Sequence, residues 1–198
     1  MTAPSGNRPC RSLDTGGAGG SPRPIRLARE AETMAFARRL APVLRDGGMV
    51  LLDGDLGAGK TAFARALIRS LAGADIEVPS PTFTLVQSYA LDGVEVTHAD
   101  LYRIDDPDEI DELGLEDAAA GGLVLVEWPE RAGGRLDRGA LRLRFAIADD
   151  GARLVTIDAP ADWTARLGRH TCELPVDDAG GAEAPDAPGT PAPLRNDR

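Results

Sequence analysis

Residues 54–61 read Gly54-Asp55-Leu56-Gly57-Ala58-Gly59-Lys60-Thr61 and fit the phosphate-loop pattern Gly-x-x-x-x-Gly-Lys-Thr in full. The glycines let the main chain turn tightly and direct successive N–H groups at phosphate oxygens. We expect the Lys60 ammonium to reach the β- and γ-phosphates of a nucleotide, and the Thr61 hydroxyl to bind Mg²⁺. The whole stretch is therefore predicted to form a nucleotide-binding loop, with Thr61 as a metal ligand.

The sequence on either side of the loop supports this prediction. Residues 49–52 form a short apolar run, which is typical of a buried strand. Residues 61–71 have apolar side chains at helical spacing, and Gly73 follows them as a stop signal. A strand before the loop and a helix after it are the context that a phosphate-binding loop requires.

The lysine content of the chain favours ATP over GTP. Lys60 is the only lysine in the sequence, and it stands where a slim point charge suits a nest of phosphate oxygens. GTPases of the Ras type read guanine through an Asn/Thr-Lys-x-Asp motif, which needs a second lysine. The expected cofactors are therefore ATP and Mg²⁺.

The remaining pattern predicts a single α/β domain with a mixed sheet. Helices are expected over 30–44 and 107–119, the second capped by Asp105 or Asp106. Strands are expected over 84–91, 94–99, 123–126, 140–148 and 153–157. Turn signals at 92–93 and 149–151 predict two antiparallel hairpins, whereas strands joined through helices should be parallel. The folded domain should span 25–168, with disordered Gly- and Pro-rich tails over 1–24 and 169–198.

Composition and charge limit the classes of function. No apolar run reaches the roughly 18 residues that span a bilayer, and residues 1–22 lack the apolar region of a secretory signal. Cys10 and Cys172 form no disulfide or zinc pattern, which fits a reducing compartment. We therefore expect a cytoplasmic protein. Its net charge of −10 makes direct tRNA binding unexpected, because nucleic acids are bound by clustered basic residues.

ATP hydrolysis also needs a carboxylate at the end of a second strand. Glu127 follows the apolar strand 123–126, and Asp100 follows the strand 94–99. Both acids are candidates for the carboxylate that holds Mg²⁺ or its water shell, and Lys60, Asp100 and Glu127 are the candidate catalytic residues. Either acid could instead have a local structural role, Glu127 by capping a turn and Asp100 by pairing with Arg103.

Three further residues are candidates for the same site. Thr82 lies in a Pro-rich connection where nucleotide switches place a phosphate-sensing threonine, although a turn residue is equally consistent. His98 could be a general base, but its isolation favours a structural role. Trp128 is expected to be a packing residue rather than a stacking platform, although it could contact the nucleotide because it adjoins Glu127.

Four motifs in this order identify the chain as similar to the TsaE (YjeE) family. They are the loop 54–61, Pro-Thr-Phe-Thr-Leu-Val at 81–86, His-Ala-Asp-Leu-Tyr-Arg at 98–103 and Glu-Trp-Pro-Glu at 127–130. The phosphate loop alone is widespread, whereas the ordered combination is highly specific. The resemblance covers about 25–160, the whole predicted fold.

The resemblance implies an ATPase required for threonylcarbamoyladenosine formation on tRNA. It implies association with a TsaB-like subunit and a TsaD-like threonylcarbamoyl transferase, with ATP hydrolysis resetting that complex. Transferred by position, Lys60 binds phosphate, Thr61 and Glu127 hold Mg²⁺, Asp100 serves hydrolysis and Thr82 acts in the switch. Thr33 is implied as a contact of the nucleotide base.

Two other functions remain open on sequence grounds. A small-molecule kinase could use the same loop with a lid built from Arg131, Arg135 and Arg138. A nucleotide-sensing module without catalysis would need only the binding residues. Residues 105–117 hold eight Asp or Glu and no Lys or Arg, and form either a solvated helix or a docking face for a basic partner.

Overall fold

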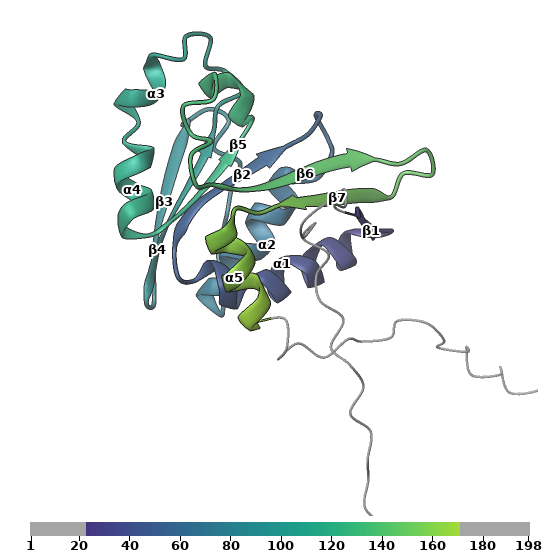
Figure 1. Cartoon of the computed structure of the whole chain (residues 1–198). Helices are drawn as coiled ribbons and strands as arrows, with labels where there is room; N and C mark the ends of the chain where they lie inside the picture. The colour runs from purple at the N-terminus through teal and green to yellow at the C-terminus, as the bar shows by residue number, and fades with distance from the viewer. Residues whose placement is uncertain (1–22, 171–198) are drawn as a thin grey trace, which may run out of the picture.

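The computed structural model describes residues 23–170. Its chain forms one mixed sheet with helices on both faces, as the sequence predicts (Figure 1). The seven strands lie in the order β1-β7-β6-β2-β5-β4-β3. The predicted tails lie outside the described residues, except for residues 23–24 and 169–170.

The centre of the sheet is parallel. Strand β2 (Gly48–Asp53) pairs in parallel with β5 (Leu123–Glu127) and with β6 (Leu141–Ile147), and β4 (Val94–Asp100) pairs in parallel with β5. The carboxyl ends of β2, β4 and β5 therefore meet at one edge, where open α/β sheets bind their ligands.

The outer strands are antiparallel, as the two turn signals predict. Strand β3 (Val86–Leu91) pairs with β4, and β7 (Arg153–Asp158) pairs with β6. Strand β1 (Ile25–Leu27), which is too short to give a sequence signal, adds to β7. β3 begins two residues later than the predicted start at 84, because residues 81–84 form a turn.

The apolar run of β2 divides its side chains between two cores. Val50 and Leu52 face helices α1 (Glu30–Leu44), α2 (Lys60–Ala72) and α5 (Ala161–His170). Met49 and Leu51 face the side of α3 (Glu109–Glu112) and α4 (Leu115–Gly121). Burial on both faces explains why this strand reads as continuously hydrophobic. Within residues 23–170, no helix is long and apolar enough to cross a membrane.

The single helix predicted over 107–119 is wrong. Two short helices occupy this segment, because Gly114 adopts φ 62° between them and a left-handed residue cannot continue an α-helix. The cap predicted at Asp105 or Asp106 is also wrong, because the N-cap of α3 is Asp108 and no side chain caps the helix. Asp106 instead accepts the Asp108 N–H at 3.0 Å in the turn before the helix. Helix α5 and the 3-10 helix η1 (Pro129–Ala132) were not predicted from the sequence.

Candidate nucleotide-binding site

The phosphate loop connects the end of β2 to the start of α2. Gly54, with φ 135°, lies so close to β6 that an added Cβ would come 2.2 Å from the Phe145 carbonyl oxygen. No other residue fits there without moving the backbone. Gly59 is the N-cap of α2, so Lys60 and Thr61 occupy its first turn. The helix N-terminus, with its partial positive charge, therefore opens onto the loop.

Lys60 is buried, and its ammonium is held at the centre of the loop. Nζ donates to the main-chain oxygens of Gly54 and Asp55, and it lies 3.7 Å from the centroid of the Trp128 ring. Burial lowers the pKa of Lys60. Nearby carboxylates act in the opposite direction, and Glu127 has the largest of these raising effects. The contacts of this buried ammonium are therefore two main-chain oxygens and one aromatic ring. A buried cation in such surroundings is suited to an anionic ligand.

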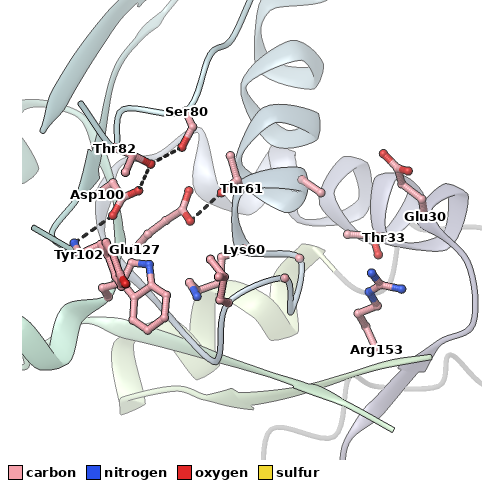
Figure 2. Close-up of a pocket in the computed structure, with 15 residues that line it drawn as sticks. Glu30, Thr33, Lys60, Thr61, Ser80, Thr82, Asp100, Tyr102, Glu127 and Arg153 are labelled. Carbon is pink, nitrogen blue, oxygen red and sulfur yellow. Dashed lines mark hydrogen bonds between the residues drawn. The ribbon is translucent and has the colours of Figure 1, made fainter. Parts of the chain in front are cut away.

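The two predicted carboxylates lie side by side at the ends of adjacent parallel strands. Asp100 is the register partner of Glu127, and both side chains are buried. Glu127 Oε2 accepts the Thr61 hydroxyl at 2.8 Å, and Oε1 lies 2.9 Å from His98 Nε2. The loop and the second acid are thus already joined through a side-chain hydrogen bond (Figure 2).

Thr82 reaches Asp100 from the Pro-rich connection. Its hydroxyl donates to Asp100 Oδ2 at 2.6 Å, while the Tyr102 N–H donates to Oδ1 at 3.0 Å. Both carboxylate oxygens of Asp100 therefore have partners. Arg103 lies over the Phe83 ring, 5.6 Å from its centroid, so the suggested pairing between Asp100 and Arg103 is not what holds this acid.

These side chains line a cavity of about 520 Å³, a volume in the range of small-molecule sites. Ten of the predicted site residues line it: Thr33, Leu56, Gly57, Gly59, Lys60, Thr61, Thr82, Asp100, Glu127 and Trp128. The other three, Gly54, Asp55 and Ala58, belong to the loop but do not line the cavity. Figure 2 shows the acids and Thr82 on one side of Lys60, and Thr33 on the other.

Five lining residues were not predicted from the sequence: Glu30, Ala62, Ser80, Tyr102 and Arg153. Tyr102 lies within the motif at 98–103 and could have been found there. Arg153 comes from β7, far along the chain, and nothing in its local sequence indicates the site. It adds a positive charge near Thr33 and Glu30 (Figure 2).

The oxygen donors of the cavity fit magnesium better than a transition metal. Within residues 23–170, no group of three or more His, Cys, Asp and Glu side chains could hold a metal ion by itself. Mg²⁺ does not need such a group, because proteins bind it through one or two carboxylates with phosphate and water oxygens. The Thr61 hydroxyl and the Glu127 carboxylate, 2.8 Å apart, are a donor set of this kind.

Comparisons with known proteins agree on one family. The model for "Threonylcarbamoyl adenosine biosynthesis protein TsaE" matches residues 27–155. The chain is 42% identical over 131 residues to a protein of Rickettsia bellii named tRNA threonylcarbamoyladenosine biosynthesis protein TsaE, covering 66% of this chain and 91% of that protein. It is 36% identical over 135 residues to the Bacillus subtilis protein of the same name, covering 68% of this chain and 84% of the relative.

A solved structure has the same fold. The crystal structure of Bacillus subtilis YdiB superposes with a TM-score of 0.61 at 31% sequence identity. The match covers 75% of this chain and 93% of that one. The family match ends within β7, so helix α5 lies beyond it.

Proposed function

The chain belongs to the TsaE family of threonylcarbamoyl adenosine biosynthesis proteins, and from this membership and the cavity we propose that it is a Mg-ATP-hydrolysing P-loop ATPase. Its role would be to support a complex with TsaD-like and TsaB-like proteins during formation of N6-threonylcarbamoyladenosine on tRNA. Such a role belongs in the cytoplasm, where tRNA is modified.

One observation carries the ATPase assignment. A buried ammonium, a helix N-terminus and two carboxylates from neighbouring strand ends converge on one cavity. The ammonium and the helix end favour an anionic ligand, and the acids lie where a cation shared with that ligand would balance their charge. A triphosphate with its magnesium ion meets both requirements.

Each residue then has a separate task. Lys60 and the loop amides bind phosphate oxygens, and the Thr61 hydroxyl and the Glu127 carboxylate hold the cation. Bound Mg²⁺ supplies Lewis-acid neutralisation of phosphoryl charge. Asp100 is the group available to orient a water molecule, once its hydrogen bond from Thr82 opens.

The Thr82–Asp100 hydrogen bond supports dependence on a partner. Each carboxylate oxygen of Asp100 already accepts one hydrogen bond, so the candidate water-orienting group is partly engaged in the isolated chain. We expect slow turnover by the isolated protein. Partner binding near the connection 79–85 would change the rate by altering that hydrogen bond.

The geometry gives the kinase alternative no support. A kinase lid would need arginines directed at the cavity, but Arg135 instead pairs with Asp108 and Asp111. Arg131 is near Asp105, with 3.8 Å between Nη1 and Oδ1. None of Arg131, Arg135 and Arg138 lines the cavity.

The proposal is tested by calorimetric titration with ATP and by phosphate release, each with and without Mg²⁺ and purified TsaB-like and TsaD-like proteins. We expect Mg-dependent ATP binding by the chain alone and a change in hydrolysis when the partners are added. Glu127→Gln keeps the side-chain volume but removes the charge, so hydrolysis should fall by about 100-fold while ATP still binds. Transfer of the γ-phosphate to a metabolite, or no nucleotide binding, would reject the assignment.

A further inference from the structure

His98 lies fully buried below the cavity and contacts the predicted metal ligand. Its Nε2 is 2.9 Å from Glu127 Oε1, and the exposed fractions of the two side chains are 0% and 2%. His98 does not line the cavity, so it can influence ligands there only through another residue. Glu127 is the residue that joins it to the site.

The register of the sheet places this contact. His98 pairs with Leu125 and Asp100 pairs with Glu127 across the parallel strands β4 and β5. Side chains two residues apart on a strand point to the same face of the sheet. His98 therefore lies on the same face as the two acids, two residues before Asp100 along β4. The ring therefore approaches the Glu127 carboxylate from the interior of the sheet, on the side away from solvent.

Both oxygens of the Glu127 carboxylate are fixed by this arrangement. Oε1 contacts the imidazole, and Oε2 accepts the Thr61 hydroxyl at 2.8 Å. A carboxylate that holds Mg²⁺ only accepts hydrogen bonds, so Nε2 would be the donor in the contact with His98. The donated bond turns Oε2 toward Thr61, the other predicted metal ligand.

A purely structural role does not explain a histidine at this position. Its Nδ1 is buried and has no hydrogen-bond partner among the residues that the structure describes. An unsatisfied buried polar atom costs free energy, and an apolar side chain of similar size in this strand would avoid that cost. What the imidazole provides in return is the Nε2–H that contacts Glu127.

We propose that His98 is a positioning residue that orients the Glu127 carboxylate for Mg²⁺ bound with the nucleotide. The inference rests on the proposed ATPase function and adds one residue to it. Hydrogen bonds of this kind to metal ligands commonly change metal affinity by about 10- to 100-fold.

Two amide substitutions separate positioning from packing. In His98→Gln, the side-chain nitrogen stands the same number of bonds from Cα as Nε2, so it can donate to Glu127. In His98→Asn, the amide is one bond shorter and falls short of Oε1. His98→Leu removes the donor while keeping the site filled. Both amides are polar, so their comparison stays informative even if the leucine variant fails to fold.

The main readout is the gain in nucleotide affinity that Mg²⁺ provides, measured by calorimetry with ATP in EDTA and in Mg²⁺. Phosphate release is measured in parallel. We expect His98→Asn and His98→Leu to lower the magnesium-dependent gain by about tenfold or more, with metal-free ATP affinity unchanged. His98→Gln should keep the gain within about threefold of the wild type, which a packing role would not predict.

Two outcomes would overturn the inference: an unchanged magnesium gain in His98→Asn and His98→Leu, or an equal loss in folded His98→Gln and His98→Asn. Either result would leave the ATPase proposal intact, provided that the wild type binds Mg-ATP. A wild type that binds no nucleotide would instead reject the proposed function itself.

Discussion

At the scale of single residues, two left-handed non-glycine residues each adjoin a segment that contributes side chains to the cavity. Among residues 23–170, the non-glycine residues with positive φ are Leu85 at 63° and Trp128 at 58°. Trp128 directly follows Glu127 and places its ring against Lys60. Leu85 closes the turn that carries Thr82, and its carbonyl oxygen accepts the Asp100 N–H at 2.9 Å. Such conformations cost free energy and persist where the surrounding contacts enforce them.

Lys60 gives a prediction at this scale. Because burial lowers its pKa, the folded state binds fewer protons than the unfolded state as the pH approaches the ordinary lysine value of 10.5. The free energy of unfolding of the wild type should therefore gain a contribution that grows with pH in that alkaline window. Below the window, the cost of burying the charge is fully present.

Lys60→Met removes this cost while keeping a similar apolar volume over Trp128. We expect ATP binding to be lost, the Tm near neutral pH to be unchanged or higher, and the alkaline gain in stability to disappear. Thermal unfolding of both proteins across the pH range, with calorimetry for ATP, measures all three. A lower Tm for Lys60→Met would contradict the view that this lysine is kept for binding at the expense of stability.

At the scale of elements, α3 and α4 carry most of the acidic segment 105–117. Arg135 contacts Asp108 and Asp111, but these acids keep 79% and 70% of their side-chain surface exposed. Exposed ion pairs of this kind contribute little to stability. The segment is held chiefly by Ile110 and Leu115, which are buried in the core on this face of the sheet.

Gly114 allows a clean test of the break between these helices. An added Cβ would meet no atom within 4 Å, so Gly114→Ala changes only the backbone energy at φ 62°. We expect a loss of about 1 kcal/mol in the free energy of unfolding. The matched control is Gly121→Ala, equally free of contacts but without a positive φ, which should be neutral or stabilising by about 0.5 kcal/mol. Urea unfolding distinguishes them, and equal effects would mean that the left-handed conformation is not required.

At the scale of the whole molecule, α5 packs against the face of the sheet that α1 and α2 cover, beyond the segment matched by the family model (Figure 1). Trp163 is buried there and donates from Nε1 to the Gly139 carbonyl oxygen at 2.9 Å. Arg166 stacks on the indole and donates to the carbonyl oxygens of Gly47 and Val43. Helix α5 thus ties the end of α1 to the start of β2, at the opposite end of that strand from the phosphate loop.

Trp163→Ala should cost about 3–5 kcal/mol in the free energy of unfolding, because a large buried ring leaves a cavity. Trp163→Phe keeps most of the volume and loses the hydrogen bond, so about 1–2 kcal/mol is expected. Chemical denaturation gives both values. ATP affinity of the folded variants should be unchanged, since Trp163 does not line the cavity. A loss below 1 kcal/mol for the alanine variant would show that α5 contributes little to the fold.

Much of this molecule follows from local sequence, because the relevant signals act over short distances. The phosphate loop, the hairpins and the buried strands depend on glycine positions and on runs of apolar residues, which can be read one segment at a time. The positions of Asp100 and Glu127 at strand ends were also predictable, because each closes a run typical of a strand and parallel strands align their carboxyl ends.

Only the tertiary structure decided which of these groups touch. Register between β4 and β5 placed His98 beside Glu127, and the antiparallel addition of β7 brought Arg153 to the cavity. The break at Gly114 was equally invisible, because a left-handed conformation is allowed but not required by glycine. Local sequence fixes which backbone shapes each segment can adopt, whereas contacts between distant side chains depend on how the segments pack together.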